Sequence, residues 1–180
     1  VAPEDVSHVV TADHDQLEKM RAYLTQMVPG WDVEVVRQAV NETLHSIIDP
    51  IVFDEAVELI EQHQAAGRDV VIVSASGTEV VEPIGQMLGV DYVIATTLVE
   101  KDGRYTGDVD FYAYGPNKAK AMEQLAAERG YDLTESYAYS DSETDAPMLA
   151  AVGHPFAVNP DKTLRRMADE NGWPILIFAR

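Results

Sequence analysis

The apolar residues of this chain are spaced in two different ways. Over residues 13–28 and 33–48 they recur every three or four positions, which is the spacing of amphipathic helices. Pro29-Gly30 separates the two segments and breaks helical structure between them. We therefore expect a small helical subdomain at the front of the chain, over residues 1–49.

From residue 50 onward, short β-branched runs alternate with helical segments. Residues 70–73, VVIV, are too short for a helix and lack polar alternation, so they predict a strand buried on both faces. Asp102-Gly103 lies between two alternating segments and predicts a β-hairpin over 98–111. The other expected elements are helices over 51–66, 78–88, 115–129, 147–152 and 163–170, and strands over 93–95, 137–139, 156–158 and 173–178.

This alternation is typical of the α/β class. We expect residues 50–180 to form an open parallel, Rossmann-like sheet with helices on both faces, and residues 1–49 to form a partial helical cap. Pro174 places the last strand at an edge of the sheet, because proline cannot donate a ladder hydrogen bond. Ligands of such sheets bind beyond the carboxyl ends of the strands.

Composition narrows the classes of partner. The chain has 31 acidic and 13 basic residues, and its net charge of −18 disfavours nucleic acid and anionic membrane surfaces. It has no cysteine, which excludes disulfides and thiolate metal sites, and no apolar run approaches the ~20 residues that span a bilayer. We expect a soluble, cytoplasmic protein that binds neither nucleic acid nor membrane.

The acidic loop after the strand at 137–139 is the strongest chemical signal. Asp141, Glu143 and Asp145 place three carboxylates within five residues. Like charges at this range raise each other's pKa unless a cation shares the site. Mg²⁺ is the expected cation, since it accepts one or two carboxylates and leaves room for a phosphate. The alternative is that Asp141 and Asp145 only cap a helix.

Two further polar residues belong to the same rim of the predicted sheet. Ser74 follows the strand at 70–73, and Lys118 lies at the start of the helix over 115–129. A hydroxyl, a lysine and a metal-binding carboxylate pair suit a phosphate group. Lys120 is a competitor of Lys118, but the Gly-Pro-Asn sequence before residue 118 favours the latter. A solvated lysine at a helix start is the alternative interpretation.

Together these segments resemble the haloacid dehalogenase-like phosphohydrolase superfamily, in its phosphoserine phosphatase-like branch. Ser74 in VIVSASG is similar to the second motif, Lys118 in YGPNKAKA to the third, and the aspartates of YSDSETDAPML to the fourth. The resemblance implies a magnesium-dependent phosphomonoester hydrolase that acts on a small phosphorylated metabolite through an aspartyl-phosphate. Ser74, Ala75 and Lys118 would bind phosphate, Asp141 and Asp145 would bind Mg²⁺, and Ser74, Lys118 and Asp141 would be the catalytic residues.

Three features depart from the family pattern. Thr144 stands where phosphoserine phosphatases usually have asparagine, and Ala75 where they have glycine, which leaves the substrate open. The first motif, a strand ending in Asp-x-Asp-x-Thr/Val, supplies the nucleophile and the general acid/base in this family. Asp13-His14-Asp15 is the only candidate, and we interpret it as helix capping. We therefore expect the nucleophile to be missing, through truncation, degeneration or residues upstream of Val1.

Other function classes fit less well. A non-catalytic, receiver-like module that binds phosphate or metal also clusters acidic residues, a hydroxyl and a lysine, and turnover of a phosphomonoester would discriminate it from an enzyme. Ser76 lacks the Gly-x-Ser-x-Gly elbow of serine hydrolases. No Gly-x-Gly-x-x-Gly or P-loop sequence is present, which argues against dinucleotide and NTPase folds.

Overall fold

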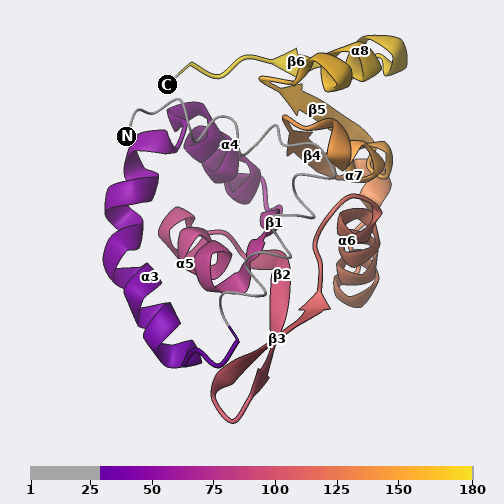
Figure 1. Cartoon of the computed structure of the whole chain (residues 1–180). Helices are drawn as coiled ribbons and strands as arrows, with labels where there is room; N and C mark the ends of the chain where they lie inside the picture. Colours follow the sequence, from indigo (N-terminus) through magenta and orange to yellow (C-terminus); the bar gives the residue numbers. More distant parts are fainter. Residues whose placement is uncertain (1–28, 180) are drawn as a thin grey trace.

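The computed structural model describes residues 29–179 (Figure 1). The helix expected over 13–28, together with Asp13 and Asp15, lies outside the described residues. Within the described part, the helices are α3 (Val33–Ile48), α4 (Asp54–Ala65), α5 (Thr78–Leu88), α6 (Pro116–Arg129), α7 (Ala146–Ala150) and α8 (Lys162–Asn171). Short 3-10 turns cover η1 (Asp49–Ile51), η2 (Leu133–Glu135) and η3 (Glu143–Asp145).

Six strands of the described chain form two three-stranded sheets. The strands are β1 (Val71–Gly77), β2 (Tyr92–Lys101), β3 (Arg104–Phe111), β4 (Tyr137–Ser140), β5 (His154–Val158) and β6 (Ile175–Leu176). The first sheet has the order β1-β2-β3, in which β1 and β2 are parallel and β2 and β3 form an antiparallel hairpin. The second sheet, β4-β5-β6, is parallel throughout. Parallel pairing confirms the predicted α/β class.

The helices cover both faces of these strands. Helix α5 packs on β1 and β2, and α6 packs on β2 from the other side, as Figure 1 shows. Helix α7 packs on β4 and β5, α8 packs on β5, and α3 packs on α5. Among residues 29–179, none of these helices combines the length and apolar character that a membrane crossing would require. The predicted boundary between cap and core near residue 50 remains a prediction.

Most element boundaries follow the sequence pattern closely. Asp32 caps α3 by accepting a hydrogen bond from the Val35 N–H, and α5 spans the predicted residues 78–88. Helix α4 begins three residues later than predicted, because the chain first makes the turn η1 and then an extended step at Val52 and Phe53.

The strands differ more from the prediction than the helices do. Strand β2 is continuous from Tyr92 into the hairpin, so the separate strand expected over 93–95 is only its first part. Strand β6 has two residues instead of six, and it lies at the sheet edge, as Pro174 predicted. Strand β1 continues past Ser74 to Gly77, with a register shift after Ser74.

The apolar core of the second sheet lies between its strands and the helices α7 and α8. Ala138 and Ala157 are small side chains on the covered face of β4 and β5, and Leu149 and Leu164 are fully buried against them. The cluster is completed by Val152 and Ala168, with Met122, Leu133, Trp173 and Ile175 packed at its border. This packing fixes the end of β4, from which the acidic loop emerges.

Candidate active site

The acidic loop turns sharply after β4. Ser142 caps η3, since its Oγ accepts a hydrogen bond from the Thr144 N–H, 3.3 Å away. Asp145 stands at the N-cap position of α7 but makes no side-chain capping bond. Helix capping therefore does not account for the Asp145 carboxylate, and the serine takes that role in η3.

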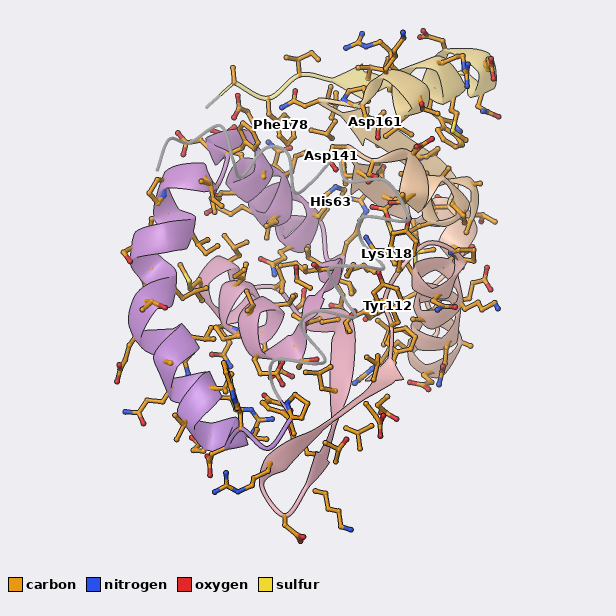
Figure 2. All side chains as sticks on the ribbon, viewed as in Figure 1. His63, Tyr112, Lys118, Asp141, Asp161 and Phe178 are labelled. Atoms are coloured by element: carbon orange, nitrogen blue, oxygen red, sulfur yellow. The ribbon has the colours of Figure 1, made fainter. Side chains whose placement is uncertain are left out.

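Asp145 is instead part of a buried ion pair. Its Oδ1 lies 2.8 Å from the Nζ of Lys118, and Ser140 Oγ donates to its Oδ2 over 2.7 Å. Lys118 is 8% exposed and Asp145 7% exposed, whereas Lys120 lies on the solvent side of α6. Burial of the Lys118 ammonium argues against a solvated lysine and selects it over Lys120. Figure 2 shows Lys118 and Asp141 in the region between α4 and α6.

Asp141 lies beside this pair at the end of β4. Burial raises the pKa of the Asp141 carboxyl, and a hydrogen bond from its own backbone opposes this. The negative charges of Asp145 and Asp161 raise that pKa further, while the Lys118 ammonium lowers it. A bound cation would relieve the cost of keeping these carboxylates ionised in a partly desolvated site.

Asp161 is a site residue that the motifs did not point to. Its carboxylate accepts hydrogen bonds from the Glu143 N–H at 2.9 Å and the Leu164 N–H at 2.7 Å, so it ties the acidic loop to the start of α8. Its own N–H donates to the carbonyl oxygen of Asp141 at 2.9 Å. The Asn-Pro-Asp sequence before a helical segment was a signal of a cap, but not of a contact with the acidic loop.

Ser74 and Ala75 lie on the other sheet, in β1. Ser74 Oγ accepts a hydrogen bond from the Ser76 N–H at 3.2 Å. The strand predicted over 70–73, with Ser74 after it, is longer in the structure, because β1 resumes pairing with β2 at Gly77, opposite Thr96. The pairing of β1 with β2 is irregular between Ser74 and Gly77, which is the segment expected to bind phosphate.

The described residues fit a metal only in part. Residues 29–179 contain no group of three or more histidine, aspartate or glutamate side chains placed to hold an ion. Mg²⁺ needs only one or two protein carboxylates, because waters and a phosphate complete its coordination. Asp141 meets that requirement, and Asp145 could share the ion or orient its waters while it pairs with Lys118. This donor set is compatible with Mg²⁺.

Sequence comparison agrees with this geometry. Residues 4–150 match the family model described as haloacid dehalogenase-like hydrolase, which covers most of the chain. The chain therefore belongs to the haloacid dehalogenase-like hydrolase family. The predicted family is thus confirmed.

Two individual relatives are similar to this chain over most of its length. A Streptomyces azureus protein called "Inhibition of morphological differentiation protein" is 62% identical over 170 residues, which cover 94% of this chain and 61% of the relative. A probable phosphatase of Mycobacterium tuberculosis is 57% identical over 169 residues, covering 94% of this chain and 59% of the relative. The chain thus spans about three-fifths of the length of these relatives.

A solved structure gives the branch of the family. The phospho-aspartyl intermediate analogue of a phosphoserine phosphatase superposes with a TM-score of 0.65 at 26% identity, covering 91% of this chain and 73% of that one. This similarity confirms the phosphoserine phosphatase-like branch that the motifs predicted.

Proposed function

We propose that this chain forms the phosphate-binding and metal-binding part of a magnesium-dependent phosphomonoester hydrolase. The observation that carries the proposal is the buried pair of Lys118 and Asp145, with the partly desolvated Asp141 beside it. A lysine held away from solvent by a carboxylate is placed to neutralise an incoming dianion. The names of the similar phosphatases support the same reaction class.

Each residue has a separate role in this proposal. The positive charge of Lys118 stabilises the negative charge of the transferred phosphoryl group, and Ser74 donates its hydroxyl hydrogen to a phosphate oxygen. Asp141 is the main ligand of Mg²⁺, and Asp145 orients the Lys118 ammonium through their 2.8 Å contact. Mg²⁺ would neutralise further charge on the phosphate.

The nucleophile lies outside the described residues. Ser74 and Asp141 cannot replace it, since one is used on phosphate and the other on metal. Among the described strands, β1 and β4 border the site and do not pair with each other. We propose that a strand with an Asp-x-Asp-x-Thr/Val ending pairs with both and presents the nucleophilic aspartate to the phosphate. The substrate class is a small phosphorylated metabolite, and a cytoplasmic location remains a prediction.

The test is phosphate release by the full-length protein that contains this chain. We expect hydrolysis of p-nitrophenyl phosphate or phosphoserine with Mg²⁺ and none with excess EDTA. Asp141→Asn should raise the Mg²⁺ concentration needed for half-maximal rate and lower the rate at saturation. Asp169→Asn, at an exposed position of α8, is the matched control.

Two results would contradict the proposal. An unchanged Mg²⁺ dependence in Asp141→Asn would remove Asp141 from the metal site. Phosphate or Mg²⁺ binding without turnover, in a protein with an intact first motif, would favour the non-catalytic regulatory module instead.

A further inference from the structure

Thr96 is a buried polar residue in the middle of β2 that the motifs do not include. It is 7% exposed, and its hydroxyl lies between two backbone segments that each lead to a proposed phosphate ligand. Thr96 Oγ1 donates to the Ala75 carbonyl oxygen over 2.7 Å and accepts from the Ala113 N–H over 3.1 Å. A hydroxyl group can donate only one hydrogen bond. Because the Thr96 hydroxyl donates to the Ala75 carbonyl, it can only accept from the Ala113 N–H.

The bond to Ala75 controls the peptide group that faces Ser74. In a trans peptide the C=O and the following N–H point in opposite directions, and the described chain contains no cis bond. When Thr96 fixes the Ala75 carbonyl on one side, the Ser76 N–H is fixed on the other side, where it donates to Ser74 Oγ at 3.2 Å. In that bond the Ser74 oxygen is the acceptor. The hydroxyl hydrogen of Ser74 is therefore available to be donated to a phosphate oxygen.

The bond to Ala113 controls the turn before Lys118. Ala113 is fully buried, and the turn after it is closed by bonds that its neighbours make with the first residues of α6. Asn117 Nδ2 donates to the Tyr112 carbonyl oxygen at 3.1 Å, and the Lys118 N–H donates to the Gly115 carbonyl oxygen at 3.1 Å. The Lys118 backbone is therefore anchored to a turn that Thr96 holds.

We propose that Thr96 is a positioning residue, which sets the distance between the Ser74 hydroxyl and the Lys118 ammonium through one shared hydroxyl group. This proposal rests on the proposed phosphatase function. Thr96 also accepts a bond from Thr78 Oγ1 at its carbonyl oxygen, 3.0 Å away, which fixes the backbone around it. The two phosphate ligands come from different elements, and a single side chain keeps them in register.

The test uses three variants of the full-length protein. Thr96→Val keeps the shape but removes both hydroxyl bonds, and Thr96→Ser keeps the hydroxyl. Val81→Ala, at a position of α5 that is 2% exposed, controls for loss of stability alone. We would first measure the melting temperature of each protein. We would then measure kcat and KM for p-nitrophenyl phosphate, and the inhibition constant of inorganic phosphate, at a temperature below every melting transition.

Thr96→Val should lower kcat about 10-fold or more and weaken inhibition by inorganic phosphate, because small displacements of catalytic groups have large effects on rate. Thr96→Ser should restore most of both. Val81→Ala should lower the melting temperature and leave kcat within about twofold of the wild type. A Thr96→Val enzyme with wild-type kcat and phosphate inhibition, or one that serine does not rescue, would overturn the proposal.

If the proposed function itself is wrong, the experiments give a different result. A wild-type protein that hydrolyses no phosphomonoester contradicts the phosphatase assignment. In that case, calorimetric binding of inorganic phosphate with Mg²⁺ decides the role of Thr96. Weaker binding to Thr96→Val than to wild type supports it, while equal binding to both, or none to either, overturns it.

Discussion

Lys118 and Asp145 are two charged residues whose side chains have almost no contact with solvent. Their attraction offsets the desolvation of both charges only while both are present. Removing one partner leaves the other charge buried without compensation, at a cost of about 3–5 kcal/mol in the free energy of unfolding. These two positions are therefore coupled in stability as well as in function.

Lys118→Met should lower turnover of every phosphomonoester alike, by about 100-fold or more, if the lysine stabilises charge on the transferred group. The measurement is kcat for two or more substrates, such as phosphoserine and p-nitrophenyl phosphate, at a temperature where the variant is folded. Lys120→Met, on the exposed side of the same helix, is the control and should retain activity. A loss confined to one substrate would make Lys118 a specificity residue instead.

His63 on α4 makes a contact with strand β4 that depends on pH. Its Nε2 lies 2.8 Å from the hydroxyl of Tyr139, and its ring packs edge-on against Tyr137. Burial lowers the pKa of His63 below the ordinary 6.5, and the positive charge of Arg68 lowers it further. The folded protein thus binds this proton less readily than the unfolded chain.

Stability should therefore fall as pH drops below about 6.5, since protonation of His63 favours the unfolded chain. We expect the urea midpoint of His63→Gln to change less than that of the wild type between about pH 7.5 and pH 5.5. His45→Gln, at an exposed position of α3, is the control and should follow the wild type. Parallel curves for His63→Gln and wild type would contradict this role.

At the scale of elements, the turn between α7 and β5 passes very close to η2. Gly153 donates its N–H to the Leu133 carbonyl oxygen at 2.9 Å. A Cβ added at Gly153 would lie 1.7 Å from the carbonyl oxygen of Thr134, so the two backbones must separate to admit one. Glycine is required here by close approach, not by its backbone dihedral angles.

Gly153→Ala should lower the free energy of unfolding by about 1–3 kcal/mol or more, because the clash is with backbone that cannot rotate away. Chemical denaturation of the purified variant measures this. Gly130→Ala is the control, since residue 130 has a φ of 76° but open space around its Cβ. It reports the cost of backbone strain alone, and an equal or larger loss there would contradict the clash.

The sequence predicted the elements better than the contacts between them. Glycines 89 and 130, both with left-handed backbones, mark the ends of α5 and α6, and the hairpin at Asp102-Gly103 is present. The extension of β1 past Ser74 could not be foreseen, because the irregular segment is bonded at Ala75 by the hydroxyl of Thr96, which is distant in sequence. Propensity acts locally, whereas that irregularity is set by tertiary contacts.

For the candidate site as well, the sequence predicted the chemical residues better than the contacts between them. Lys118 and Asp145 were assigned to phosphate and metal separately, and their direct pairing emerged only from the packing of α6 against α7. Asp161 and Thr96 were missed, since each acts on backbone groups and belongs to none of the motifs. Motif spacing indicates groups that carry chemistry, but not the residues that hold those groups in place.

At the scale of the whole molecule, the C-terminal segment connects the second sheet to α4. Phe178 exchanges two hydrogen bonds with Asn159, and its ring packs edge-on against Phe53 with the centroids 5.9 Å apart. The Ala179 N–H then donates to the Glu55 carboxylate at 2.9 Å. Figure 1 shows this segment crossing from β6 toward α4.

Phe178→Ala should lower the free energy of unfolding by about 1–2 kcal/mol, since a half-buried aromatic side chain loses part of its contact area. Ile177→Ala is the neighbouring control, because Ile177 is 64% exposed and should have little effect. Thermal or urea unfolding of both variants provides the comparison. Equal losses in the two variants would show that the ring contact with Phe53 does not stabilise the molecule.

Each of the two sheets comes from one uninterrupted stretch of chain, residues 71–111 for the first and 137–176 for the second. Contacts within a stretch are near in sequence, so little loop entropy opposes their formation and each half can assemble rapidly by itself. Lys118 belongs to neither stretch, because α6 lies between them, and its ion pair with Asp145 joins this helix to the acidic loop after β4. Ser74 comes from the first stretch, Asp141 from the second and Lys118 from the segment between them, so we expect the complete site to form only after each sheet has formed.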